Sequence, residues 1–184
     1  TVDGVDVREY RLEDLYSRIG YVPQTPVVFK GTVRENVAYG GADGATDREV
    51  ERALGIAQLL DHVRTMPEGI DTDLSQHGWS LSGGQRQRLA IARAVCRKPS
   101  IYIFDDTFSA LDYRTDRDLR EALDRETRGA TRIVVAQRVG TIMDADRIVV
   151  LDRGRVVGQG THAELMRSCP LYREIAESQL EAGV

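Results

Sequence analysis

Residues 81–106 constrain the fold more than any other stretch, because they join a glycine-containing helix start to an apolar strand that ends in two acids. The segment LSGGQ at residues 81–85 can begin a helix, since Ser82 can cap the first turn and Gln85 can reach back to the backbone of Ser82. Pro99 is expected to end that helix before the strand begins. This order of elements predicts an α/β fold.

The first turn of the helix contains Gly83 and Gly84, and each glycine costs a helix about 1 kcal/mol relative to alanine. In return the glycines leave the backbone uncovered, so that an anion can closely approach the N–H groups at the positive end of the helix. The alternative is a capped helix that merely tolerates glycines. Arg86 and Arg88 lie off the apolar stripe of this helix, and we expect them on a solvated surface rather than in catalysis.

The apolar run at residues 101–104 predicts a strand buried on both faces of a parallel sheet, and residues 131–136 predict another buried strand. Ligands of such sheets bind beyond the carboxyl ends of the strands, where Asp105 and Asp106 would project. A carboxylate there can hold Mg²⁺ against the phosphates of a nucleotide, and its neighbour can orient an attacking water. The alternative is a pair of acids in a solvated loop.

Two further elements follow from periodicity. Residues 48–58 predict a helix with a buried face formed by Val50, Ala53, Leu54 and Ala57. Residues 147–151 and 155–158 predict a hairpin around the turn sequence DRG at residues 152–154.

The sequence LSGGQRQRLAIARAV, followed by IYIFDDTFSALD, resembles the nucleotide-binding domain of ATP-binding cassette (ABC) transporters, with the signature motif, the Walker B strand and the D-loop in their usual order. The resemblance runs through nearly all of the chain. It implies a partial P-loop NTPase (ABC ATPase) fold with a mostly parallel sheet and a helical subdomain. Residues 1–184 would form one domain fragment, with the helical subdomain at about 45–98 and the Walker B, D-loop and H-loop core at about 99–184.

The resemblance also implies roles for individual residues. Gln24 would be the Q-loop residue that reaches Mg²⁺ and the attacking water, and Asp105 would hold the metal together with it. The catalytic residues would be Asp106, Gln137 and Gln24. ATP held by a second nucleotide-binding domain would be bound in trans by Ser82, Gly83, Gly84 and Gln85, and the D-loop would comprise Ser109, Ala110, Leu111 and Asp112.

A transmembrane domain is the second expected partner. Residues 28–37 resemble the exporter version of this region, in which Phe29 and its neighbours receive a short helix of the membrane domain. The plainer interpretation of Phe29 is a core aromatic residue before a glycine turn. The loop at residues 71–80 stands where exporters sense the membrane domain, with Gln76 at a position where glutamate is common.

Three departures from the family affect the expected activity. The chain contains no G-x-x-x-x-G-K-[ST] phosphate-binding loop, so we expect it to be the C-terminal two-thirds of the domain and to be inactive alone. Asp106 stands where most members have a glutamate, and Gln137 stands where members that hydrolyse well have a histidine. Together the last two departures resemble the degenerate half of a heterodimeric exporter.

Composition excludes several other classes of protein. The 184 residues are 41% hydrophobic, which suits one domain with a sizeable core. With 25 basic and 29 acidic residues intermixed, the net charge of −4 gives no positive field for nucleic acid. Two cysteines provide no disulfide framework. No apolar run approaches the ~20 residues of a membrane-spanning helix, so we expect the membrane domain elsewhere and this domain at the cytoplasmic face of the inner or plasma membrane.

The leading hypothesis is therefore an ATP-binding exporter subunit that couples ATP binding and hydrolysis to substrate export, with an intact signature acting in trans and a degenerate site of its own. A non-transport ABC ATPase that acts as an ATP-gated clamp is one alternative. A regulatory ABC module without turnover is the other.

Overall fold

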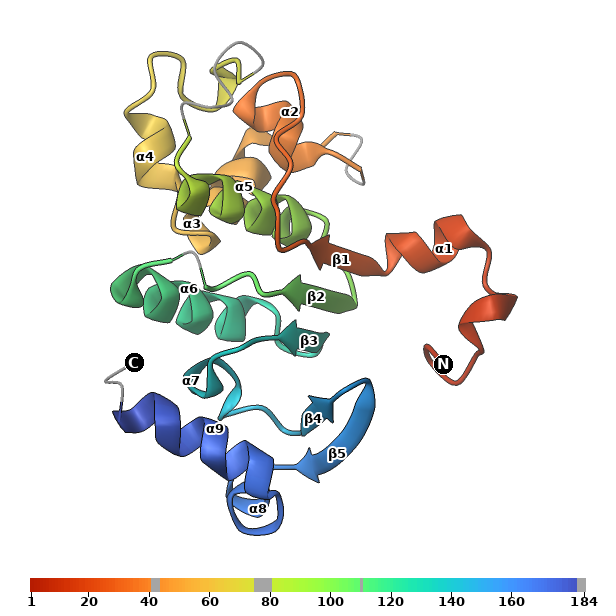
Figure 1. Cartoon of the computed structure of the whole chain (residues 1–184). Coiled ribbons are helices and arrows are strands. Elements are labelled where there is room, and N and C mark those ends of the chain that lie inside the picture. Colours follow the sequence, from red (N-terminus) through yellow and green to blue (C-terminus); the bar gives the residue numbers. More distant parts are fainter. Residues whose placement is uncertain (41–43, 75–80, 110, 182–184) are drawn as a thin grey trace. The chain divides into compact units, whose positions relative to one another are not determined.

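The structure is a computed structural model that describes residues 1–40, 44–74, 81–109 and 111–181. These residues form two compact units, Thr1–Val135 and Ala136–Val184, and each is described by itself (Figure 1). The predictions for Gln76 and Ala110 concern residues outside the described ranges.

The first unit contains a parallel sheet of three strands in the order β1-β2-β3. The strands are β1 (Ile19–Val22), β2 (Ile101–Asp105) and β3 (Thr131–Val135). Val22 lies opposite Phe104, and Asp105 lies opposite Val135, so the three strands end at the same edge. The predicted parallel sheet is confirmed.

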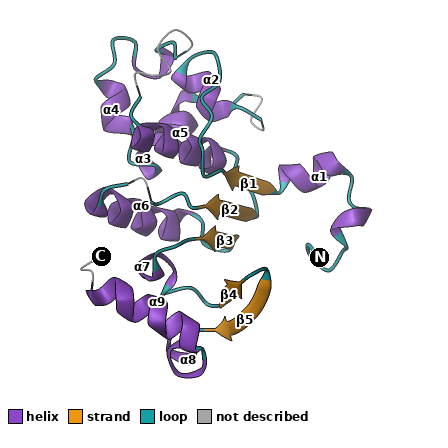
Figure 2. Ribbon diagram, viewed as in Figure 1, coloured by secondary structure: helices purple, strands orange, loops and turns teal. Residues whose placement is uncertain are grey.

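The helices of the first unit lie mostly in one group above the sheet in Figure 2, with α6 beside β2 and β3. The α-helices are α1 (Leu12–Ser17), α2 (Val33–Ala38), α3 (Asp47–Ile56), α4 (Leu60–Arg64), α5 (Gly83–Cys96) and α6 (Tyr113–Glu126). Short 3₁₀ turns form η1 (Val7–Glu9) and η2 (Gly69–Asp71). The predicted buried face of α3 is confirmed, because Val50, Ala53, Leu54 and Ala57 are all at most 2% exposed.

Reciprocal capping fixes where three of these helices begin. Thr32 caps α2, Thr46 caps α3 and Ser82 caps α5, and in each helix the side chain of the third residue bonds back to the cap backbone. Those third residues are Glu35, Glu49 and Gln85. Each cap satisfies N–H groups that have no partner inside the helix, which stabilises its start by about 1 kcal/mol.

Burial corrects the prediction that the strands are covered on both faces. Tyr102 and Phe104 are 3% and 1% exposed and join the core formed with α3, α5 and α6, whereas Ile101 and Ile103 are only half-buried. On β3, Ile133 and Val135 are 49% and 52% exposed. Successive side chains of a strand point to opposite faces. The prediction was therefore wrong because, in the described residues, the large helical core takes up one face of the sheet.

The second unit contains α7 (Val139–Ile142), the strands β4 (Ile148–Asp152) and β5 (Arg155–Gly160), α8 (His162–Ser168) and α9 (Pro170–Glu181). The strands pair antiparallel, so the predicted hairpin is confirmed. Its turn residues Arg153 and Gly154 have φ values of 47° and 76°, a pair of left-handed conformations typical of tight hairpins. Ile148, Val150 and Leu165 belong to a small core of this unit.

No helix in the described residues has both the length and the apolar character to cross a bilayer.

Leu54 allows a test of the helical core. Its side chain is 0% exposed, so Leu54→Ala should lower the free energy of unfolding by about 2–5 kcal/mol, measured by denaturant unfolding of the protein. Leu12→Ala is the matched control, because Leu12 is 63% exposed and its loss should change stability by less than about 0.5 kcal/mol. Equal effects of the two substitutions would contradict the assigned core.

Candidate functional site

The glycine-containing start of α5 faces outward. Ser82 Oγ accepts a hydrogen bond from the Gln85 backbone N–H at 3.2 Å, and Gln85 Oε1 accepts one from the Ser82 backbone N–H at 2.7 Å. Ser82 and Gly83 are exposed, and a Cβ built on Gly83 would meet no described residue beyond its own helix turn within 4 Å. The N–H groups of Gly83 and Gly84 lie in the first turn, where a helix provides no acceptor of its own. An anion can therefore reach this end of α5.

Polar side chains hold α5 in place behind its exposed start. Gln87, which is 2% exposed, donates to the Pro23 carbonyl at 3.1 Å. Arg86 donates to the Leu81 carbonyl at 2.6 Å, and Arg88 donates to the Gln58 carbonyl at 2.7 Å. Both arginines are half-buried, so their predicted place on a solvated surface was wrong. Burial lowers the pKa of the Arg88 guanidinium, an effect that the Asp112 carboxylate opposes.

A second group of polar side chains gathers at the carboxyl ends of β1 and β2. Gln24 follows β1 by two residues, and its Nε2 donates to Asp106 Oδ2 at 3.2 Å. Tyr21 Oη donates to Asp105 Oδ2 at 3.1 Å, which raises the pKa of Tyr21. The structure therefore brings together Gln24, Asp105 and Asp106, and their roles in catalysis stay predictions.

Asp106 occupies an unusual backbone conformation, with φ at 43°. Aspartate tolerates this left-handed region better than most residues. The Asp106 N–H donates to the Val135 carbonyl at 2.9 Å, and its carbonyl accepts from Ser109 Oγ at 2.9 Å. The backbone of Asp106 is thus fixed by the end of β3 on one side and by the start of the D-loop on the other.

The donor set at this edge fits a magnesium ion held mainly by a nucleotide. No group of three or more His, Cys, Asp or Glu side chains converges in the described part of the chain. Mg²⁺ in phosphate-transfer sites uses one or two carboxylates and takes its other ligands from phosphates and water. Asp105, with the amide oxygen of Gln24, matches that requirement.

The D-loop residues differ in what they contact. Ser109 is exposed, while Leu111 is 8% exposed and belongs to the core. Asp112 caps α6 by accepting from the Thr115 N–H at 3.0 Å, and this bond lowers the pKa of Asp112. Ala110, the remaining D-loop residue, lies outside the described ranges.

Gln137 belongs to the second unit, where α9 holds its backbone. Gln179 Nε2 donates to the Gln137 carbonyl at 2.8 Å, and Gln179 Oε1 accepts from the Val139 N–H at 2.8 Å. One side chain of α9 therefore fixes the backbone on both sides of Arg138. The role of Gln137 beside a phosphate stays a prediction.

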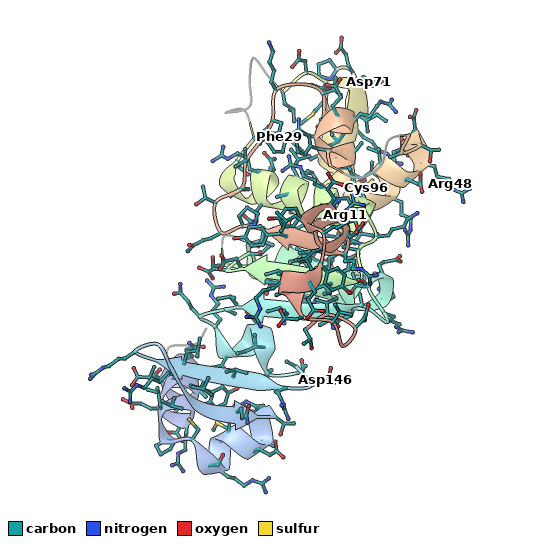
Figure 3. All side chains as sticks on the ribbon, turned by 90° about the vertical axis from the view of Figure 1, so that its right-hand side faces the viewer. Arg11, Phe29, Arg48, Asp71, Cys96 and Asp146 are labelled. Carbon is teal, nitrogen blue, oxygen red and sulfur yellow. The ribbon has the colours of Figure 1, made fainter. Side chains whose placement is uncertain are left out.

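Phe29, labelled in Figure 3, takes part in an aromatic cluster that is neither fully buried nor fully exposed. Its ring stacks on Tyr39 with the ring centroids 4.1 Å apart, and Tyr39 is 54% exposed. Asn36, which is 1% exposed, bonds both the N–H and the carbonyl of Phe29, at 2.8 and 2.9 Å. A buried amide therefore holds the backbone of Phe29 beside an exposed aromatic ring, and contact of Phe29 with a membrane domain stays a prediction.

Arg93 of α5 supports this cluster, and the sequence analysis missed it. Its guanidinium lies 4.4 Å from the Phe29 ring centroid and donates to the Asn36 carbonyl at 2.8 Å, to Asn36 Oδ1 at 3.0 Å and to the Val27 carbonyl at 3.0 Å. Burial lowers its pKa to about 10. The sequence signal was an arginine between Ala92 and Ala94, at a helix position otherwise surrounded by buried residues.

The loop at residues 71–80 is described only to Leu74. Asp71 accepts from Arg34 Nε of α2 at 2.9 Å, which lowers the pKa of its carboxyl group, and Leu74 is 2% exposed. Residues 75–80, including Gln76, lie outside the described ranges, and contact of this loop with a membrane domain stays a prediction.

A family model described as ABC transporter matches residues 1–109, more than half of the chain. The chain belongs to the ABC transporter family. Two relatives extend the likeness to nearly all of the chain. An uncharacterized ABC transporter ATP-binding protein of Mycobacterium tuberculosis is 49% identical over 180 residues, and an ATP-dependent lipid A-core flippase of Pseudomonas fluorescens is 41% identical over 181 residues. These alignments cover 97% and 98% of this ABC chain.

A solved structure supports the exporter type. The chain matches the structure of a bacterial Atm1-family ABC exporter with ATP bound, with a TM-score of 0.91 and 40% identity over 97% of this chain and 31% of that one. The expected ABC ATPase fold of exporter type is thereby confirmed. The ABC chain spans 31% of the Mycobacterium tuberculosis relative and 30% of the flippase.

Arg93→Met tests the support of the aromatic cluster. Methionine keeps most of the length of the side chain but leaves the Asn36 and Val27 oxygens without their cationic donor. The free energy of unfolding should fall by about 2–3 kcal/mol, measured by denaturant unfolding of the protein. Arg48→Met on α3 is the control, because Arg48 is exposed, and it should be nearly neutral. A neutral Arg93→Met would show that these contacts do not stabilise the fold.

Proposed function

We propose that this chain is the ATP-binding part of an ABC exporter subunit, which couples ATP binding and hydrolysis to the export of a substrate across a membrane. Its partners are a second nucleotide-binding domain and a transmembrane domain, and its place is the cytoplasmic face of the inner or plasma membrane. The family and the 40% identity to an exporter that was solved with ATP bound support this assignment.

One observation carries the trans role of the signature. Ser82 and Gly83 are exposed, and a Cβ added to Gly83 would have no atom within 4 Å among the described residues outside its own helix turn. The fold of the first unit therefore does not require glycine at position 83. A phosphate that approaches the backbone N–H groups closely would require a residue without a side chain there. We infer that ATP held by the partner domain lies against Ser82, Gly83, Gly84 and Gln85.

The residues at the carboxyl ends of the strands would belong to the ATP site of this chain, as opposed to that of the partner domain. Asp105 and Gln24 would hold Mg²⁺, which supplies charge neutralisation for the phosphates. Asp106 and Gln24 are hydrogen-bonded to each other and would orient the attacking water. The chain has no phosphate-binding loop among its 184 residues, so the phosphates of this site would need other residues of the protein.

The identities of Asp106 and Gln137 support a slow or non-hydrolysing site. Aspartate is one methylene shorter than glutamate, and a misplacement of about 1 Å can cost catalysis about 100-fold. Gln137 is neutral and cannot take up a proton as an imidazole can. The subunit would then contribute mainly its signature to turnover, at the active site of its partner.

Gly83→Ala tests the trans role. The added methyl group has room within the chain, and alanine favours a helix, so the fold should be unchanged or slightly more stable. ATP turnover of the full-length, assembled transporter should nevertheless fall about 10- to 100-fold, because the phosphate can no longer approach closely. Gly55→Ala in α3 is the control, since its Cβ would meet only Leu60 Cδ2 at 3.8 Å. Normal turnover in the Gly83 variant would contradict the proposal.

Asp106→Asn tests the degenerate site. In the same assembly we expect most of the ATP turnover to remain, because the active site would use the carboxylate of the partner. The measurement is steady-state phosphate release, compared with that of the unmodified transporter. Abolished turnover would show that Asp106 serves an active site of its own.

The same two departures also favour the regulatory module without turnover. That alternative predicts no ATP hydrolysis by the complete assembly, whereas the exporter hypothesis predicts turnover that depends on Gly83. A non-transport clamp would instead show turnover without any membrane-spanning partner.

A further inference from the structure

A cavity of about 380 Å³ opens in the first unit, away from the residues assigned to ATP. It lies between the ends of α5 and α6 and the start of β2, and its lining includes Arg52, Lys98, Ser100, Tyr102, Glu126 and Arg128. Its volume falls within the range of small-molecule sites in proteins. Tyr102 and Asp105 are three residues apart on β2, so they lie on the order of 10 Å apart and point to opposite faces of the sheet.

Tyr102 provides a polar group that the fold does not use. The residue is 3% exposed, and its ring lies parallel to that of Phe104, with the ring centroids 6.0 Å apart. Among the described residues its hydroxyl has no hydrogen-bond partner, although the side chain lines the cavity. Burial raises the pKa of Tyr102, so the hydroxyl keeps its proton and can donate it. The Tyr102 oxygen is not sealed from solvent, so a group bound in the cavity can accept a hydrogen bond from it.

The charge around the hydroxyl favours an anion. Three cationic side chains line the cavity, Arg52, Lys98 and Arg128, against the single carboxylate of Glu126. Arg52 forms an ion pair with Glu126, and Lys98 Nζ forms one with Glu49 Oε1 at 2.8 Å. For Arg128, the described part of the chain offers no ion pair or hydrogen bond. The cavity is therefore locally positive in a chain whose net charge is −4.

We propose that this cavity binds a small molecule through an oxyanion, a carboxylate or a phosphate group, which accepts a hydrogen bond from the Tyr102 hydroxyl and lies among the cationic side chains. Arg128 supplies the compensating charge, since Arg52 and Lys98 already have acidic partners. This site is additional to the proposed export function and does not depend on it.

The test uses the full-length protein, with its nucleotide sites saturated by Mg²⁺ and a non-hydrolysable ATP analogue so that the added anion cannot act there. The midpoint of thermal unfolding is measured against increasing inorganic phosphate, and separately against acetate, with sodium chloride keeping the ionic strength constant. We expect one of the two anions to raise the midpoint with saturation, which identifies the oxyanion class.

Two variants show where the anion binds. Tyr102→Phe keeps the ring that packs on Phe104 and removes only the hydroxyl, so the half-saturating anion concentration should rise about fivefold, as expected for one lost hydrogen bond. Arg128→Gln should raise it at least as much, whereas Arg125→Gln, which changes an exposed residue in the last turn of α6 outside the cavity, should not. If neither anion shifts the midpoint, or if the shift is unchanged in Tyr102→Phe, the proposal is overturned and the ions act non-specifically.

Discussion

The parallel pairing of β1 with β2 is the constraint on which the candidate site depends. Val22 lies opposite Phe104, so segments about 80 residues apart in the chain end at the same edge of the sheet. Only this register brings Gln24 within 3.2 Å of Asp106 and places Tyr21 against Asp105. Backbone hydrogen bonds, not local sequence, thus assemble the polar residues that are proposed to surround a nucleotide.

Helix α5 connects this edge to the rest of the first unit. Gln87 binds the Pro23 carbonyl next to Gln24, and Arg93 binds Asn36 and Val27 at the aromatic cluster. Gly83 and Arg93 are ten residues apart, which is about 15 Å along a helix. A single helix therefore joins the exposed signature to the surface around Phe29.

Much of the fold could be predicted from the sequence because local signals agreed with the tertiary structure. The cap at Ser82, the buried face of α3 and the hairpin at Arg153 and Gly154 each follow from a pattern within a few residues. Strand burial could not be predicted in the same way. Ile133 and Val135 are as apolar as any buried strand, and their exposure depends on which face the helices cover.

For the candidate site too, some residues could be predicted from the sequence and others could not. Gln24, Asp105 and Asp106 could be named from motifs, whereas the contacts of Arg88 and Arg93 could not, because their acceptors are carbonyl groups of distant segments. Every residue has a backbone carbonyl, so the sequence does not indicate which one accepts a hydrogen bond. The unused hydroxyl of Tyr102 is likewise visible only when the neighbours of β2 are known.

The Gln179 side chain gives the last helix an influence on a residue more than 40 positions earlier. Its amide spans the carbonyl of Gln137 and the N–H of Val139, replacing the hydrogen bonds that a regular helix or strand would provide there. Fraying of α9, or removal of residue 179, would remove both of these hydrogen bonds. Helix α9 thus constrains the backbone of the segment that carries Gln137.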